Sequence, residues 1–423
     1  MTVQENLGAQ NQAGAEGQGV AESQGVAKSQ GVTRGAAVSG RSRLDSLTSL
    51  RFFAAFLVFI SHIYTRIWYT GADPERSFMP ALVMRLSLIG VEFFFLLSGF
   101  VLTWSARPTD SHGSFWRRRL AKIFPNHAVT WLVGLVLLLW TNQQVTAAQG
   151  TTTLFLVDAW TPDKHVQVGV NPVSWSLSCE AFFYLCFPLL LWAISKIPAR
   201  RLWYYAIGCV LLIAAVPVLV MRLTPAEPKW SGLQATEVQV WLTYNFPLTR
   251  MLEFVLGILL ARIVLTGNWY PRRFRYGLVL LPVAVLLAMS LYYPYGNGVL
   301  LVIPLAMVIL AAAQTDIEDR RTFLRRPLWI WLGDLSFAFY MTHWLIMQYT
   351  YPLIDPHRRA GVALMLACSA AYLLVSVFAS WLLYSVVERP VMRRWGRSRR
   401  AGAATGGRGR DAVPSSEVRS PAS

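Results

Sequence analysis

Apolar runs long enough to cross a bilayer recur along almost the whole chain, and they restrict its fold more than any other feature. Ten such runs can be counted, centred roughly on residues 47–65, 82–104, 124–141, 175–195, 202–221, 240–264, 277–293, 298–314, 328–350 and 362–386. A hydrocarbon core about 30 Å thick needs about 20 apolar residues of helix, and it offers unpaired backbone groups no water. The sequence therefore predicts an all-α polytopic membrane protein with about ten transmembrane helices.

The composition agrees with a membrane protein, since 54% of the 423 residues are hydrophobic and only 14% are charged. A net charge of +17 could indicate nucleic-acid binding, but the positive charges stand between the apolar runs. We therefore expect a lipid bilayer and no nucleic acid as a partner. The four cysteines all fall in apolar runs without metal-ligand spacing. They are interpreted as small buried residues, and no metal site is predicted.

The basic residues predict the orientation in the cell membrane. If the N-terminus lies in the cytoplasm, 29 of the 39 Lys and Arg residues fall in cytoplasmic segments and seven fall outside. Cytoplasmic loops of membrane proteins carry such an excess of Lys and Arg. Both termini are therefore predicted to be cytoplasmic.

The two ends of the chain differ from the middle. Residues 1–43 contain an imperfect repeat, "QGVAES QGVAKS QGVTRG", and residues 396–423 are rich in Arg, Gly, Ala and Ser. Such segments bury too little apolar surface to fold, so both are predicted to be disordered tails. The membrane domain is expected to span residues 44–395.

The first apolar run carries two ionisable residues. In "LDSLTSLRFFAAFLVFISHIY", Arg51 stands near the start and His62 follows eleven residues later. Eleven steps of 100° leave their side chains about 20° apart on one helix face and about 16 Å apart along the axis. A charge at the bilayer centre costs roughly 3 kcal/mol on insertion scales, so such residues usually have a function. Arg51 alone could be an anchor at the headgroups and His62 alone a packing residue, but their shared face favours a joint role.

Other runs also carry close pairs of polar residues. These pairs are Arg85 with Glu92, Ser178 with Glu180, Arg250 with Glu253, Ser336 with His343, and Glu388 with Arg389. A spacing of three makes Arg250 and Glu253 a plausible ion pair on one helix, for which a purely structural role remains open. The same structural alternative applies to Glu388 and Arg389. Ionisable residues on several spans predict a shared polar interior.

A basic cluster, "SFWRRRLAKIFP", precedes the third run. It contains Arg117, Arg118, Arg119 and Lys122. Such a cluster can anchor the protein on anionic lipid. It can equally bind a ligand rich in phosphate, because guanidinium forks match phosphate oxygens in pairs.

Five sequence blocks together resemble the acyltransferase-3 family of bacterial integral membrane O-acyltransferases, over about residues 44–392. The family's arginine–histidine signature is matched by Arg51 and His62, and its "GVxxFFxLSGF" block by "GVEFFFLLSGF". The segment "FWRRRLAKIFP" is similar to a basic block that ends in proline, and "WSLSCE" to the block "WSLSxE". The fifth block is the "ERP" that begins at Glu388.

Two positions depart from the family pattern. Lys122 stands where Arg is commoner, and Ala181 stands where many members carry a second Glu. A role for that second carboxylate is therefore not transferred to this chain.

The resemblance implies an acyl-coenzyme A as donor, acetyl-CoA above all, and no permanently bound cofactor. It implies that the nucleotide phosphates are held at the cytoplasmic face by Arg51, Arg117, Arg118, Arg119 and Lys122. His62 would then act as general base toward an acceptor hydroxyl, a task that suits a neutral imidazole. Glu180 is the best candidate to orient a polar partner or the acceptor. Transfer could be direct or pass through an acyl-enzyme, with Ser178 and Tyr184 as candidate nucleophiles.

The function implied is transfer of an acetyl or short acyl group to a hydroxyl of a sugar, a glycan or a secondary metabolite such as a macrolide. Buried charges and a polar midplane are also typical of secondary transporters, so a transporter of a small polar solute remains an alternative. A membrane scaffold or sensor is a third. Acyl-CoA-dependent transfer to an acceptor would separate the enzyme from the other two.

Overall fold

A computed structural model describes residues 43–68, 78–107, 110–229, 235–269, 275–291, 298–354 and 361–395. The predicted tails lie outside these ranges except for Arg43. Within them the chain forms helices and no strand. Every predicted apolar run contains one long helix: α1 (Asp45–Ile63), α2 (Phe78–Ser105), α3 (His112–Trp140), α6 (Ser174–Ser195), α7 (Leu202–Leu223), α9 (Pro247–Leu265), α10 (Gly277–Ser290), α12 (Val299–Ile317), α13 (Pro327–Ile354) and α14 (Val362–Leu383).

Shorter elements connect or extend the long helices. They are η1 (Tyr64–Trp68), α4 (Ala147–Leu154), η2 (Asp158–Trp160), α5 (Lys164–Gln167), η3 (Ala199–Arg201), α8 (Glu237–Val240), η4 (Trp241–Asn245), η6 (Phe323–Arg325), η7 (Tyr384–Glu388) and α15 (Arg389–Trp395). Of these, η1, η4 and η7 are single wide turns of π-helix, and η1 and η7 continue α1 and α14 without a break.

Seven helices within the described residues are long and apolar enough to cross a membrane, which confirms the multi-pass class. They span Asp45–Trp68, Phe78–Ser105, His112–Trp140, Ser174–Ser195, Ala199–Leu223, Val299–Ile317 and Val362–Trp395. The remaining predicted spans correspond to α9, α10 and α13. Of these, α10 has only 14 residues, and α9 carries Arg250, Glu253 and Arg262. The total of ten spans therefore stays a prediction.

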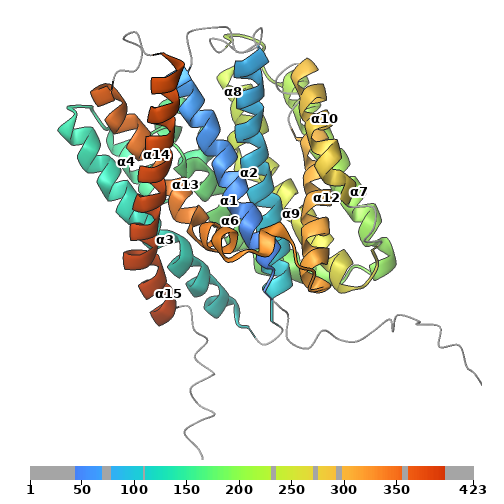
Figure 1. Ribbon diagram of the computed structural model, residues 1–423. Helices are drawn as coiled ribbons and strands as arrows, with labels where there is room; N and C mark the ends of the chain where they lie inside the picture. The colour runs from blue at the N-terminus through green and yellow to red at the C-terminus, as the bar shows by residue number, and fades with distance from the viewer. Residues whose placement is uncertain are drawn as a thin grey trace, which may run out of the picture. The chain divides into compact units, whose positions relative to one another are not determined.

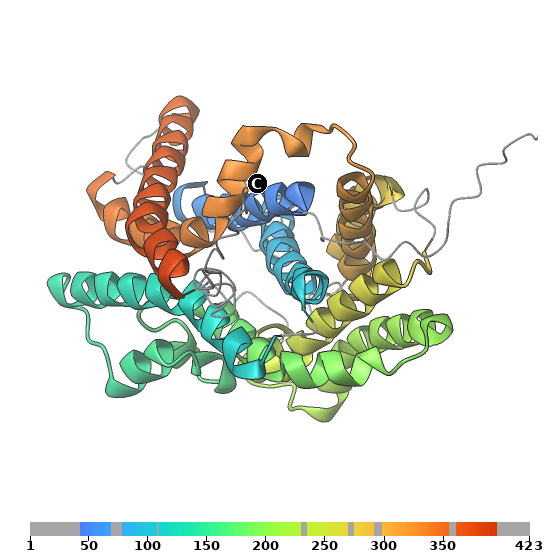
Figure 2. The same cartoon turned by 90° about the horizontal axis from the view of Figure 1, so that it is seen from below.

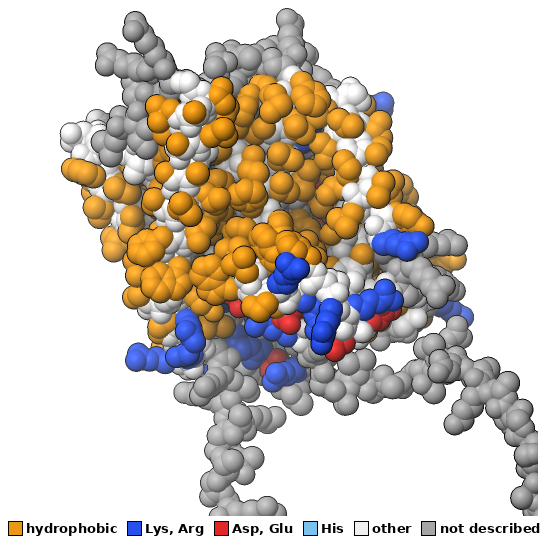
Figure 3. Space-filling view, viewed as in Figure 1, with side chains coloured by type: hydrophobic (Ala, Val, Ile, Leu, Met, Phe, Trp, Pro, Cys, Tyr) orange, Lys and Arg blue, Asp and Glu red, His pale blue; other side chains and the backbone are white. Residues whose placement is uncertain are grey.

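Segments predicted to be cytoplasmic gather at one end of the helix bundle, called here the α15 end. Arg43, just before α1, forms an ion pair with Asp334 near the start of α13 at 2.8 Å. Lys122 of α3 pairs with Glu388, just before α15. Figure 3 shows most of the visible Lys and Arg side chains at this end, below a broad apolar surface. The opposite end, with α8, is at the top of Figure 1 and is called the α8 end. Which end faces the cytoplasm stays a prediction.

Helices α1 and α2 lie inside a ring formed by the other long helices (Figure 2). Helix α2 packs so closely against α9 that a side chain at either of two glycines would collide with the facing backbone. A Cβ built on Gly99 would stand 2.0 Å from the carbonyl oxygen of Phe254, and one on Gly257 would stand 2.0 Å from that of Leu96. Small residues permit such close helix approach in membranes. This crossing fixes α2, which carries much of the lining described below.

A buried charge cluster stands beside the same crossing. Arg250 Nη1 lies 2.8 Å from Glu253 Oε1, which confirms the ion pair predicted within α9. The same nitrogen is 3.9 Å from Glu92 Oε1 of α2, and that oxygen accepts the backbone N–H of Gly298 at 3.0 Å. Arg85, one further charge on α2, donates to the carbonyl oxygen of Ala288 at 3.0 Å. These charges pair with protein groups, as buried charges in membranes generally do.

Candidate active site

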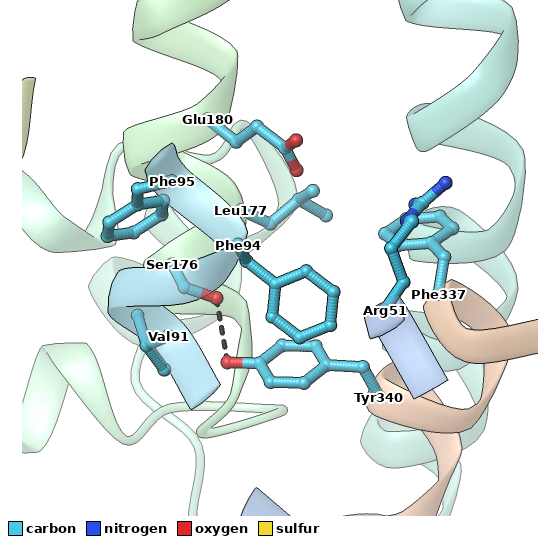
Figure 4. A pocket seen from close by; sticks show the side chains of 9 residues that line it. All are labelled: Arg51, Val91, Phe94, Phe95, Ser176, Leu177, Glu180, Phe337 and Tyr340. Carbon is cyan, nitrogen blue, oxygen red and sulfur yellow. Dashed lines mark hydrogen bonds between the residues drawn. The ribbon is translucent and has the colours of Figure 1, made fainter. Parts of the chain in front are cut away.

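Two adjoining pockets lie between α1, α2, α3, α6 and α13, and they share Arg51, Phe94, Glu180 and Phe337. Arg51 reaches them from the second turn of α1 and Glu180 from the second turn of α6. Figure 4 shows the two side chains on opposite sides of the first pocket, which Tyr340 and Ser176 close from below. The empty space within them is about 470 and 550 Å³, part of which is open to solvent.

Three cationic side chains converge on the second pocket. Arg51 comes from α1, and Arg119 and Lys122 come from α3. A spacing of three places Arg119 and Lys122 on one face of α3. Lys122 also forms an ion pair with Glu388, and the other oxygen of Glu388 accepts the Asn126 amide at 2.5 Å. Glu388, just before α15, therefore fixes the side chain of Lys122 on α3, which lines the second pocket.

The other two members of the predicted basic cluster do not line these two pockets. Arg118 forms an ion pair with Asp110 at 2.7 Å and donates to Ser114 at 2.7 Å. Arg117 precedes Arg118 on the same helix, and neither belongs to the lining of the two pockets. The sequence could not separate the four cations because the inward face of α3 depends on its neighbours.

The carboxylate of Glu180 is held by two hydroxyl groups. Tyr184, one turn further along α6, donates to Glu180 Oε1, and Ser98 of α2 donates to the same atom at 3.2 Å. All three residues line the second pocket. Ser178, the other candidate nucleophile, is buried and donates to the carbonyl oxygen of Leu156 at 2.7 Å. Of the two candidate nucleophiles, only Tyr184 therefore lines either pocket.

His62 is paired with a second histidine. His62 Nδ1 lies 2.9 Å from His343 Nε2, and the two rings stack 5.2 Å apart. His343 Nδ1 lies 3.0 Å from the carbonyl oxygen of Phe339. A carbonyl only accepts, so this nitrogen carries the hydrogen and Nε2 of a neutral His343 is an acceptor. His62 consequently donates from Nδ1, and its Nε2 keeps the lone pair that a general base needs.

The histidine pair lies beyond the wall of the first pocket. His62 does not line either pocket. Tyr340, which does, has its ring 5.9 Å from that of His343 and bonds Ser176 at 2.7 Å. The sequence predicts His343 on one helix face with Ser336 but does not single out Tyr340. Its spacing of three before His343 was the available signal, and only packing shows that Tyr340 connects the pocket with the histidines.

The chain is similar in sequence to several known proteins. A family model described as an acyltransferase domain matches residues 44–385. The acyltransferase MdmB of Streptomyces mycarofaciens is 38% identical over 367 residues, which are 84% of this chain and 94% of that protein. The putative peptidoglycan O-acetyltransferase YrhL of Bacillus subtilis is 22% identical over 78% of this chain and 55% of its own length.

A shorter match connects the chain to nodulation protein 10 of Rhizobium leguminosarum bv. viciae, at 32% identity over 41% of this chain and 49% of that protein. No solved structure matches. Nothing in these comparisons supports the transporter alternative.

Proposed function

The chain belongs to this acyltransferase family and is a multi-pass membrane O-acyltransferase, and we propose that it moves an acetyl or other short acyl group from acyl-CoA to a hydroxyl of a sugar, a glycan or a secondary metabolite such as a macrolide. The observation that carries the proposal is the convergence of Arg51, Arg119 and Lys122 on one pocket beside Glu180. A relative named as a putative peptidoglycan O-acetyltransferase supports an acetyl group and a hydroxyl acceptor.

The donor binds with its phosphates at the cationic second pocket, near the α15 end. Arg51, Arg119 and Lys122 supply three positive charges from two helices, and charge-assisted hydrogen bonds to phosphate are about twice as strong as neutral ones. The pantetheine arm then extends through the first pocket toward the α8 end. His62 stands about 16 Å further along the face of α1 than Arg51.

The transfer itself needs one base and one leaving group. His62 Nε2 takes the proton of the acceptor hydroxyl as its oxygen attacks the thioester carbonyl. The new C–O ester bond forms, the C–S bond breaks, and coenzyme A leaves as the thiol with the proton returned to sulfur. His343 is a positioning residue here, because its Nε2 accepts the hydrogen bond from His62 Nδ1 and so fixes the orientation of the His62 ring. Glu180, held by Tyr184 and Ser98, orients a polar group of either substrate in the pocket.

Arg119→Gln is expected to raise the KM for acyl-CoA by roughly 10- to 100-fold, because a hydrogen bond to a charged group contributes about 1.5–3 kcal/mol. Arg118→Gln is the matched control, since Arg118 is one position away on the same helix and pairs with Asp110 instead. KM is measured at saturating acceptor on monodisperse protein of both variants. An equal KM for the two variants would contradict the donor site.

Both termini lie in the cytoplasm of the cell under this proposal, with the cationic pocket near the cytoplasmic face. A single cysteine at exposed His165, in a chain lacking the four native cysteines, is then labelled by a membrane-impermeant maleimide added to whole cells. A cysteine at exposed Arg320 is labelled only after the cells are opened. The reverse pattern would invert the orientation and remove cytoplasmic acyl-CoA from the cationic pocket.

A further inference from the structure

A third pocket lies at the α8 end, away from the three cations. Its empty volume is about 790 Å³. It is lined by Met84, Pro162, Lys164, Gln167, Val168, Pro172, Trp175, Glu237, Val240, Trp241, Tyr244 and Asn245. These residues come from the start of α2, the start of α6, the short elements α5, α8 and η4, and the loops on either side of α5. We call it the aromatic pocket, after its three rings, Trp175, Trp241 and Tyr244.

The aromatic pocket lies next to the first pocket along α2 and α6. Met84 of α2 lines it, whereas Val91, two turns further along α2, lines the first pocket. Trp175 lines it, whereas Ser176, the next residue of α6, lines the first pocket. Trp175, which lines the aromatic pocket, packs edge to face on Phe95, which lines the first pocket, with ring centroids 6.3 Å apart.

The chemistry of the lining differs from that of the donor site. Lys164 and Glu237 bring opposite charges, so the pocket lacks the excess of positive charge that selects phosphate. Gln167 and Asn245 bring amides, which donate and accept hydrogen bonds. Flat aromatic faces next to such groups suit a ligand that is apolar on one side and carries several hydroxyls at its edge. A pyranose ring has this form, because its axial C–H groups cover one face.

We infer that the aromatic pocket binds a sugar ring of the acceptor. The inference rests on the proposed function only in identifying the bound sugar as the acceptor. His62 is in the last turn of α1, and α1 ends at the α8 end of the bundle (Figure 1). Acceptor and donor phosphates therefore occupy opposite ends of the bundle and do not compete for one site.

Sugar binding is tested without any acyl donor, by saturation-transfer NMR on the full chain in detergent. The probes are a panel of methyl pyranosides, with cyclohexylmethanol as an apolar alcohol of similar size. Wild type is expected to transfer magnetisation to the ring C–H protons of at least one pyranoside, and cyclohexylmethanol is not expected to displace it. Absence of transfer to every pyranoside, or equal displacement by cyclohexylmethanol, would overturn the inference.

Trp175→Leu and Trp241→Leu are each expected to raise the dissociation constant of the bound pyranoside by about fivefold to tenfold, which corresponds to the loss of one aromatic contact. Trp160→Leu is the matched control, because Trp160 is an aromatic residue of η2 that packs on Phe182 and Phe246 without lining the pocket. Equal weakening in all three variants would assign the effect to packing and overturn the inference. Acyl-CoA binding is measured separately: its absence in wild type would refute the proposed donor while leaving the sugar result intact.

Discussion

His62→Gln is expected to lose acyl transfer by about 10²–10⁴-fold, the contribution of a well-placed general base. Glutamine keeps a hydrogen-bonding side chain of similar length but has no basic nitrogen. Arg51, one of the cations of the second pocket (the proposed donor pocket), stands about three helical turns from His62. Binding of acyl-CoA should therefore stay within about twofold of wild type. The measurements are turnover at saturating donor and equilibrium binding of acyl-CoA on monodisperse protein.

Two further variants separate the base from a packing role. His62→Ala should be about as inactive as His62→Gln if the base is lost in both, whereas a packing histidine would leave the Gln variant active and make the Ala variant unstable. His343→Leu should retain more activity, with a loss of about tenfold, because His62 keeps its own Nε2 and loses only the acceptor that fixes its ring. Full turnover by His62→Gln would refute the assignment and make Glu180 the next candidate.

Gly257→Ala is expected to destabilise the protein by at least about 3 kcal/mol, at the upper end of the usual cost of overpacking. The added Cβ would stand 2.0 Å from the carbonyl oxygen of Leu96 and 2.9 Å from the backbone nitrogen of Phe100. Backbone atoms cannot rotate away, so α2 and α9 must separate. Because α2 carries Phe94 and Ser98 into the donor pocket, acyl-CoA binding should weaken as well. Thermal unfolding in detergent and donor binding measure the two effects.

Gly208→Ala provides the control for that substitution. Gly208 also lies within a long helix, α7, but a Cβ there meets no atom within 4 Å. Alanine in a helix interior is favoured over glycine by roughly 0.5–1 kcal/mol, so this variant should be as stable as wild type or slightly more stable. If both variants unfolded at the wild-type temperature, the close crossing of α2 and α9 would be wrong.

The positions of the long helices can be predicted from the amino-acid sequence. Each predicted apolar run contains a long helix, because backbone groups without water can only be satisfied within a helix and the length of the run sets the length of the span. Local spacing was equally reliable for Arg250 and Glu253, which pair within one helix as their separation of three predicts. The family was also readable from short motifs in order, and the comparisons confirm it.

Which polar residues come into contact depends on how the helices pack together. Arg119 and Lys122 line the donor pocket while Arg118 pairs with Asp110, a distinction set by the rotation of α3 against α1 and α6. Glu388 pairs with Lys122, 266 residues away, in place of its chain neighbour Arg389.

The same holds for the partner of His62, which lies 281 residues further along the chain, and for the three rings of the aromatic pocket, which come from α6 and η4. Hydrophobic periodicity indicates which face of a helix is buried but not which helix it packs against. Helices in lipid associate through close packing and interhelical hydrogen bonds, and these depend on both partners. Contacts between helices that are far apart in the sequence can therefore be identified only from the three-dimensional structure.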